Sequence, residues 1–186
     1  TPLTLILGPL EDMQKDTSLP TRQAQKLSVI HQSALRLLNL INQILEFRKT
    51  ETQNKKLCVC KSNIAPLVHE IGLKYKELNQ KKAIDFQIQI EKEEMLLFFD
   101  KEIITIILDN LISNAIKYTE QGKITLSLYP TTRNGVTYTE IKVSDTGYGI
   151  SAEALPHVFD RYYQESGKHQ ASGTGIGLAL VRNLVE

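Results

Sequence analysis

Two asparagines and a lysine share one face of a helix that the sequence predicts from Asp100 to Thr119. At about 100° per residue, Asn110, Asn114 and Lys117 fall within roughly 60° of one another. Asp100 is the expected side-chain cap of this helix. Isoleucine and leucine fill most other positions, which predicts a helix that is buried on most sides. The opposite face carries Leu108, Ile112 and Ala115.

Polar side chains on a buried helix need polar partners, because leaving them without any is unfavourable by several kcal/mol. Two arrangements satisfy this requirement. The amides and the ammonium form hydrogen bonds with neighbouring loops, or they face a charged ligand. The helix alone leaves both arrangements open.

Two glycine-rich segments follow this helix. In Asp145–Ile150 (DTGYGI), a carboxylate at a strand end precedes glycines, which allows the backbone to approach a flat ligand while the carboxylate accepts from an exocyclic amine. In Gly173–Leu178 (GTGIGL), the glycines allow close approach and the helix that begins there offers N–H groups to phosphate oxygens. Each segment is a weak indication when taken alone.

Neither segment matches a phosphate-binding motif of fixed spacing. Leu178 stands where a dinucleotide fingerprint requires a third glycine, and no predicted strand directly precedes Gly173. Gly167-Lys168 lacks both the upstream glycine and the following Ser or Thr of a Walker-type loop. The specific signal has to come from the order of the segments.

The first fifty residues predict a helical hairpin. Residues 1–15 have helical periodicity, with a bend expected at Pro9, and residues 21–49 form the longest predicted helix. Apolar residues on this second helix alternate spacings of three and four, which is a heptad seam. Two antiparallel helices cannot bury so wide a stripe, whereas a dimeric four-helix bundle does. The seam consists of Leu27, Ile30, Ala34, Leu37, Ile41 and Ile44.

The remainder alternates helices and strands. A polar stretch at 51–56 separates it from the hairpin, and Asn-Gly at 134–135 predicts a tight turn between two strands. The expected strands are 57–60, 83–90, 95–99, 122–129 and 136–144. The other expected helices are 63–82, a short one at 151–159 capped by Ser151, and one that begins within 173–177, after a loop at 160–172.

Composition sets broad limits. The 186 residues are 41% hydrophobic with a formal net charge of +1, so we expect a packed core and no nucleic-acid partner. No apolar run reaches the roughly 18 residues of a membrane span, and we expect no direct membrane contact for these residues. Cys58 and Cys60 have too few neighbouring ligands for zinc and are expected to be reduced, which is typical of the cytoplasm.

The segments taken in order resemble a known family. An Asn-x-x-x-Asn-x-x-Lys-Tyr helix, a strand hairpin, DTGYGI, VFDRYY, a polar loop and GTGIGLAL resemble the nucleotide-binding motifs of sensor histidine kinases. The preceding hairpin resembles the dimerisation and phosphoacceptor domain of that family. The resemblance implies an α+β architecture, in which a dimeric four-helix bundle (residues 1–50) is followed by a linker (51–56). An α/β sandwich with a mixed sheet covered on one face by helices then binds ATP (57–186).

The resemblance also implies roles for individual residues. Asn110 would bind Mg²⁺, Asn114 would reach the same metal and phosphate cluster, Lys117 would neutralise phosphate charge and Asp145 would read the adenine amino group. Phe159 and Tyr162 would anchor a loop over ATP. The other implied nucleotide-binding residues are Tyr118, Gly147, Gly149, Ile150, Arg161, Gly173, Thr174, Gly175, Ile176, Gly177 and Leu178.

The sequence departs from the family pattern at three points. The histidine that accepts the phosphoryl group in the family would precede Thr1, so we expect these 186 residues not to phosphorylate themselves. The family continues past Glu186 into closing strands. Gln164 stands where many members carry an arginine aimed at the terminal phosphate, which puts that electrostatic contribution in doubt.

The resemblance therefore implies the cytoplasmic core of a two-component sensor kinase, with a membrane-anchored bacterial parent. It would transfer the γ-phosphoryl of Mg·ATP to a histidine for relay to an aspartate of a response regulator, either separate or fused. An ATP-hydrolysing switch of the same nucleotide fold is one alternative, although such proteins place a carboxylate where Asn110 stands. A module that dimerises and relays signals without using ATP is the other.

Overall fold

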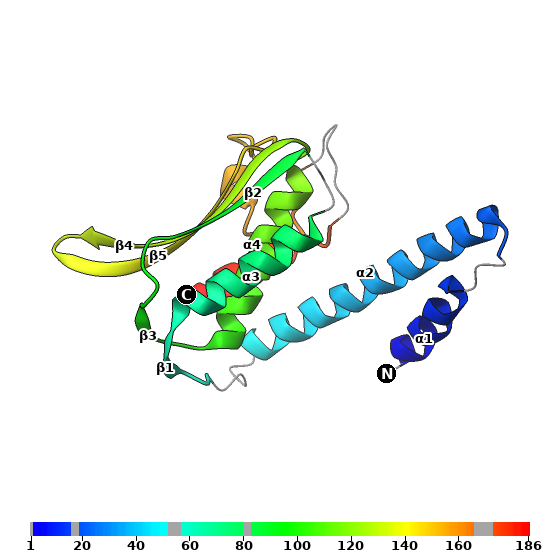
Figure 1. The fold of residues 1–186 in the computed structure, drawn as a ribbon, viewed down its shortest axis with the longest axis horizontal. Helices are drawn as coiled ribbons and strands as arrows, with labels where there is room; N and C mark the ends of the chain where they lie inside the picture. Colours follow the sequence, from blue (N-terminus) through cyan, green and yellow to red (C-terminus); the bar gives the residue numbers. More distant parts are fainter. Residues whose placement is uncertain (1, 16–18, 52–56, 80–82, 166–172) are drawn as a thin grey trace. The chain divides into compact units, whose positions relative to one another are not determined.

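The computed structural model describes residues 2–15, 19–51, 57–79, 83–165 and 173–186. Contacts divide the chain into two compact units, Thr1–Thr52 and Gln53–Glu186 (Figure 1). Most of the predicted linker at 51–56 lies outside the described residues, as does part of the predicted loop at 160–172. Each unit is described by itself below.

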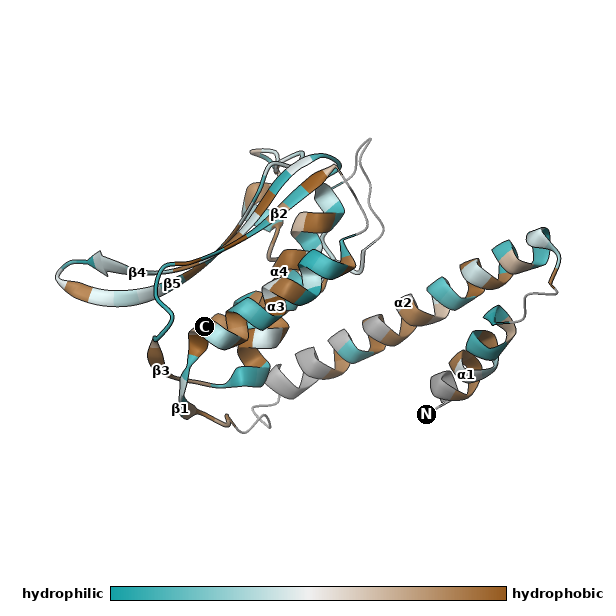
Figure 2. Cartoon of the chain, in the orientation of Figure 1, coloured by the Kyte–Doolittle hydropathy of each residue, from teal (hydrophilic) through white to brown (hydrophobic). Residues whose placement is uncertain are grey.

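The first unit is a pair of helices, α1 (Pro2–Gln14) and α2 (Thr21–Glu51), which contact each other. Helix α1 continues through Pro9. Leu7 and Leu27, each 8% exposed, are the buried apolar residues among the described side chains of this pair. The remainder of the predicted seam is open, since Ile30 and Leu37 are about half exposed. Figure 2 shows apolar and polar residues alternating along α2.

The second unit places three helices against a mixed sheet. Helix α3 (Ile64–Leu78) contacts two strands of this sheet, α4 (Lys101–Tyr118) contacts two, and α5 (Gly177–Val185) contacts α4. The sheet has the order β2-β4-β5, and a separate pair joins β1 to β3. The bounds are β1 Cys60–Asn63, β2 Ile84–Ile90, β3 Leu96–Phe99, β4 Gly122–Arg133 and β5 Val136–Asp145. This is the predicted α/β sandwich.

The core of this unit forms between the helices and one face of the sheet. Strands β2 and β4 are parallel, and β4 and β5 are antiparallel, so each strand contributes alternate residues to the core. Gly72 lets α3 approach the sheet, since a Cβ there would lie 2.8 Å from Ile88 Cδ1. The fully buried side chains include Val68, Leu108, Ile112, Ile124, Leu126 and Leu128.

Side-chain caps fix where two of these helices begin. Asn63 accepts from Ala65 N at 3.2 Å and from Met95 N at 2.9 Å, which ties the start of α3 to the residue before β3. Asp100 is 7% exposed and its Oδ1 accepts from the N–H groups of Glu102 and Ile103. The predicted cap of α4 is therefore confirmed.

The predicted strand hairpin is confirmed and is longer than expected. Strand β4 continues past Tyr129 to Arg133, and the turn uses Asn134 (φ 52°) and Gly135 (φ 77°). Because β2 pairs only as far as Leu128, the outer part of the hairpin is a two-stranded ribbon (Figure 1). Glu140 holds the ribbon together by accepting from Tyr129 Oη and from Arg133, the latter at 2.7 Å.

Three predicted elements differ from the structure. The strand expected at 57–60 is β1 at Cys60–Asn63, because these four residues are the ones that pair with β3. The helix expected at 63–82 ends at Leu78, which is 63% exposed instead of facing inward. The α-helix expected at 151–159 is a series of turns with one 3₁₀ segment at Leu155–His157, where Pro156 supplies no backbone donor.

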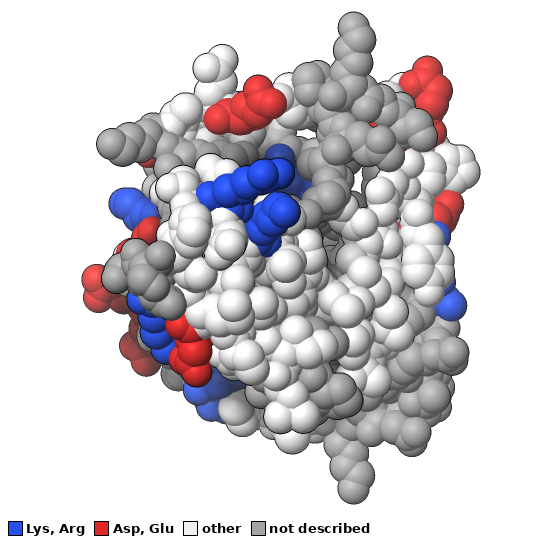
Figure 3. Space-filling model, turned by 90° about the vertical axis from the view of Figure 1, so that its right-hand side faces the viewer, with Lys and Arg blue, Asp and Glu red and all other residues white. Residues whose placement is uncertain are grey.

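Surface features are modest among the described residues. No described helix is long and apolar enough to cross a membrane. Cys58 and Cys60 are free thiols at exposed positions. In the view of Figure 3, the described acidic and basic side chains form small separate groups.

Candidate functional site

The polar stripe predicted on α4 is present. Asn110, Asn114 and Lys117 are partly exposed, whereas Leu108, Ile112 and Ala115 on the opposite face are at most 4% exposed. Asn110 Nδ2 donates to the carbonyl of Ile106 one turn earlier, at 2.8 Å. The amide nitrogen is thus bound by the helix itself, and the amide oxygen is the atom presented to other groups.

The start of α5 lies against Asn110. A Cβ built on Gly177 would lie 2.8 Å from Asn110 Oδ1, so only glycine leaves that oxygen undisturbed. This contact brings the second glycine-rich segment to the N-terminal end of the α4 stripe, at Asn110. The half-buried Gly177 is also the first residue of α5, so the helix N-terminus and the amide oxygen occupy one small region.

The first glycine-rich segment lies against the C-terminal end of α4. A Cβ on Gly147 would overlap the carbonyl oxygen of Tyr118, and Tyr148 N donates to the same carbonyl at 3.2 Å. Asp145 Oδ1 accepts from Gly147 N at 2.9 Å, which fixes the exposed carboxylate at the end of β5. Within the described part of the chain, the second oxygen of Asp145 is a remaining acceptor position for an amine.

In the last turn of α4, the ammonium group of Lys117 is held by the neighbouring Tyr118. Lys117 Nζ donates to Tyr118 Oη at 2.8 Å and lies 4.5 Å from the centre of the Tyr118 ring. Tyr148, from the first glycine-rich segment, bonds the side chain of Glu120 just beyond the helix. This bond raises the pKa of the Tyr148 phenol above its usual value. Hydrogen bonds therefore hold the segment to α4 through its backbone and its side chain.

The structure places the other predicted residues as follows. Gly147, Thr174, Gly175, Gly177 and Leu178 are partly buried, and Ile176 is buried. Gly149 has φ 74°, a left-handed conformation that favours glycine. Tyr118, Asp145, Gly149, Ile150, Phe159, Arg161, Tyr162 and Gly173 are exposed.

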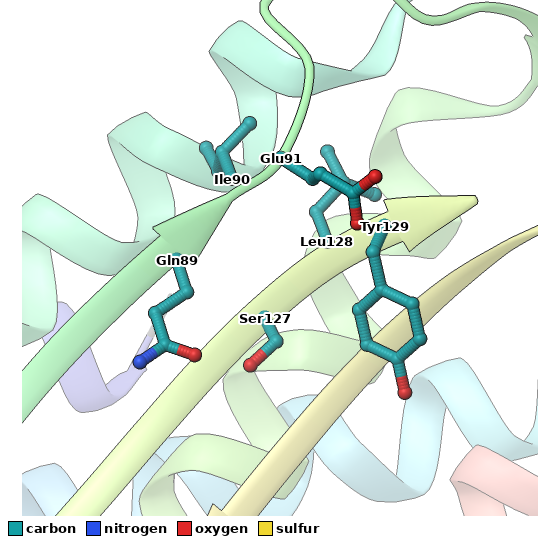
Figure 4. A pocket seen from close by; sticks show the side chains of 6 residues that line it. All are labelled: Gln89, Ile90, Glu91, Ser127, Leu128 and Tyr129. Atoms are coloured by element: carbon teal, nitrogen blue, oxygen red, sulfur yellow. The ribbon is translucent and has the colours of Figure 1, made fainter. Parts of the chain in front are cut away.

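The candidate site lies where the two glycine-rich segments approach α4. A pocket among the described residues lies elsewhere in the second unit. That pocket, of about 270 Å³, lies where β2 stops pairing with β4 and is lined by Gln89–Glu91 and Ser127–Tyr129. Figure 4 shows Gln89 and Ser127 projecting from adjacent strands. None of its lining residues is a predicted site residue.

Two contacts near the site were not predicted from the sequence. Asp109, beside Asn110, pairs with Lys74 on α3 at 3.1 Å, and Tyr75 Oη donates to the Asp109 carbonyl. Burial of Tyr75 and its proximity to Asp109 raise its pKa well above the usual value. The second contact joins Gln164 to Gly173. The sequence contained an indication for Tyr75, because a tyrosine on an otherwise apolar helix face needs a hydrogen-bond partner for its hydroxyl. It contained no indication of the contact between Gln164 and Gly173.

Two family models match the chain. Residues 1–53 match the "His Kinase A (phospho-acceptor) domain", and residues 99–186 match the "Histidine kinase-, DNA gyrase B-, and HSP90-like ATPase". The glycine-rich segments and the α4 stripe all fall inside the second match. The exposed seam of α2 falls inside the first.

Individual proteins agree with these matches along the whole chain. "Histidine kinase P4" of Formosa agariphila is 34% identical, and "Sensor histidine kinase YcbM" of Bacillus subtilis is 33% identical. The chain spans 14% of the former and 60% of the latter.

A solved structure described as full-length ShkA in complex with AMPPNP superposes with a TM-score of 0.76 at 25% identity, over 98% of this chain and 37% of that one. Acinetobacter baumannii AdeS shares the fold, with a TM-score of 0.64 over 83% of that chain. Both domain models agree with relatives that match along the whole of this chain, and the chain belongs to the sensor histidine kinases of two-component signal transduction.

Proposed function

We propose that residues 57–186 bind Mg·ATP between α4 and the two glycine-rich segments, and present its γ-phosphoryl group to a histidine on the dimerisation helices. The observation that carries this proposal is the approach of Gly177 to Asn110 Oδ1 and of Gly147 to the Tyr118 carbonyl. These contacts bring a helix N-terminus to the amide oxygen of Asn110, and bring the segment that carries the Asp145 carboxylate to the end of α4 where Lys117 lies. That combination is suited to a nucleotide triphosphate.

The donor set fits the magnesium ion. Mg²⁺ prefers oxygen ligands in proteins, and Asn110 presents its oxygen because its nitrogen is engaged with Ile106. Asn114, one turn further along the same face, is the second candidate ligand. When bound, the ion would neutralise phosphate charge. Lys117 adds a further positive charge, and Asp145 selects the base through its amino group.

Transfer of a phosphoryl group depends mainly on positioning and charge neutralisation, and the proposed residues supply both. We propose residues 1–50 as the dimerisation hairpin and 51–56 as the linker. The acceptor histidine would precede Thr1, and the product phosphohistidine would be relayed to an aspartate of a response regulator. One relative is named "Hybrid signal transduction histidine kinase D" from Dictyostelium discoideum, so a fused receiver belongs to the proposal as well as a separate one. A membrane-anchored parent, with these residues in the cytoplasm, completes it.

The hydrolytic alternative fits the site less well. An enzyme that activates water for ATP hydrolysis needs a general base, and Asn110 is an amide that cannot accept a proton at neutral pH. Asp109 is adjacent in sequence, but its carboxylate pairs with Lys74 on α3. No described group near Asn110 therefore supplies the base.

A titration of the 186-residue chain with ATP, in the presence and absence of Mg²⁺, tests the proposal. We expect saturable binding that Mg²⁺ strengthens and that the Asp145→Ala variant weakens at least tenfold. NMR shift changes should concentrate at Asn110, Asn114, Lys117 and Gly147. Absence of binding at millimolar Mg·ATP, or shift changes confined to the pocket at the end of β2, would overturn it.

A further inference from the structure

Gln164 forms an unexpected contact. Its Nε2 donates to the backbone carbonyl of Gly173 at 2.8 Å. The two residues are nine positions apart in the chain. A side chain that occupies the place of a phosphate-directed arginine is therefore engaged with the protein backbone.

A second contact supports the first. Tyr162 N donates to the carbonyl of Gly175 at 2.9 Å, so residues 162–164 and 173–175 meet at two points. Gly175 has φ 68°, and a Cβ on it would lie 2.6 to 2.9 Å from backbone atoms of Tyr162 and Tyr163. Tyr162 itself has φ 63°, an unfavourable conformation for a tyrosine that its neighbours must hold in place.

These contacts are close to the proposed phosphate side of the site. Four positions separate Gly173, which accepts from Gln164, from Gly177, which lies against Asn110 Oδ1. Ile176, between them, is 5% exposed and anchors this short stretch to the core. Because Gly173 is only four positions before Gly177, where Gly173 lies bears on where the backbone N–H groups at the start of α5 lie.

We propose that Gln164 is a positioning residue, which holds Gly173–Gly177 in place for phosphate binding through the Gly173 carbonyl and does not contact the terminal phosphate. This inference rests on the proposed function, since it concerns the same nucleotide site. It predicts that Gln164 affects every nucleotide whose phosphates touch Gly173–Gly177. A residue that bound the terminal phosphate would affect ATP alone.

The test compares Gln164→Met, which keeps the length but removes both amide donors, with the unsubstituted chain. In the nucleotide-free protein we expect shifted amide resonances and lower ¹⁵N order parameters at Gly173 and Gly175. We also expect ATP and ADP to bind about three- to fivefold more weakly, which is the loss that corresponds to one net hydrogen bond. Adenosine, which has no phosphate, should bind as before.

Two further variants complete the experiment. Gln89→Met is the matched control, because Gln89 is exposed on β2 and remote from α4 and α5. Gln164→Arg keeps N–H donors that reach the Gly173 carbonyl and should restore ADP affinity to within twofold.

The outcomes separate the two proposals. If the unsubstituted chain binds neither ATP nor ADP, the proposed function fails, and this inference fails with it. If both nucleotides bind, the inference alone fails under either of two results. One is that Gln164→Met weakens only ATP. The other is that it leaves the Gly173 and Gly175 resonances unchanged. A loss of adenosine affinity equal to that of ATP would indicate general destabilisation and would also overturn it.

Discussion

At the scale of single residues, the site depends as much on glycines, which have no side chain, as on its polar side chains. The sequence supplied the polar groups of the α4 stripe, but their relation to the glycines required the structure. Gly177 and Gly147 adopt backbone conformations that other residues share, so conformational freedom does not explain them. Glycine is required at these positions because a Cβ at either one would overlap an oxygen atom of α4.

The variant Gly177→Ala tests this requirement for space. The added Cβ would lie 2.8 Å from Asn110 Oδ1 and must displace the amide oxygen that we assign to the metal. We expect Mg·ATP to bind about tenfold more weakly, equivalent to about 1.4 kcal/mol. Thermal stability should change little, because alanine is a better helix former than glycine. Nucleotide titration and a melting curve measure both quantities.

The matched control is Gly8→Ala in α1. A Cβ at Gly8 meets nothing within 4 Å, and this helical position also gains helix propensity. Nucleotide affinity should stay unchanged in this variant. If Gly177→Ala binds Mg·ATP as well as the unsubstituted chain does, the assignment of Asn110 to the metal is wrong.

At the scale of elements, Asp100 joins α4 to the start of the second unit. Its Oδ1 caps the helix, while its Oδ2 accepts from the backbone N–H of Cys58 at 2.8 Å. Asp100 is 7% exposed, and its carboxylate accepts from the backbone N–H groups of Cys58, Glu102 and Ile103. One residue therefore fixes both where α4 begins and how the chain enters β1.

We predict that Asp100→Ala lowers the free energy of unfolding of the second unit by about 2–3 kcal/mol, because it removes the cap and leaves the Cys58 N–H without its acceptor. Asp100→Asn should lose less, since its amide oxygen still caps the helix. All 7 tyrosines lie after residue 56, so tyrosine fluorescence during urea unfolding reports on this unit alone. Glu94→Ala, at an exposed loop position, is the control. A loss below about 0.5 kcal/mol for Asp100→Ala would contradict the role of the cap.

The elements show which features could be predicted. Hairpin β4–β5 and helix α4 were predicted because their determinants are local: an Asn-Gly turn between alternating residues, and a capped apolar helix. The turns at 151–159 were predicted wrongly as a helix. Ser151 does accept from Ala154 N, but Pro156 and exposed neighbours leave only Leu155–His157 in a helical turn. The partners of Gln164 and Tyr75 could not be predicted, because each side chain joins segments through tertiary packing; the place of Tyr75 on an apolar helix face indicated only that its hydroxyl needs a partner.

At the scale of the whole molecule, the two units differ in how well each buries its apolar residues. The second unit has a closed core, with Leu108, Ile112, Ile124, Leu126 and Leu128 at most 2% exposed. In the first unit, the contact between α1 and α2 buries Leu27 but leaves Leu37, Ile41 and Ile44 between 37% and 50% exposed. Burial of such residues stabilises by about 25 cal/mol per Å². We propose that a second copy of the hairpin supplies the missing surface, because two such hairpins together can form a four-helix bundle.

The double variant Leu37→Glu/Ile44→Glu tests whether this seam forms a dimer. Sedimentation should show a dimer for the unsubstituted chain at micromolar concentration and a monomer for the variant, because four carboxylates would meet at an apolar interface. The helical melting transition of the unsubstituted chain should rise with protein concentration, as expected for coupled folding and association. The tyrosine-monitored transition should be the same in both proteins.

The control variant is Asn42→Glu, which adds a charge at an exposed position of α2 outside the seam and should remain dimeric. A monomeric unsubstituted chain, or a double variant that stays dimeric, would show that the exposed seam has another partner.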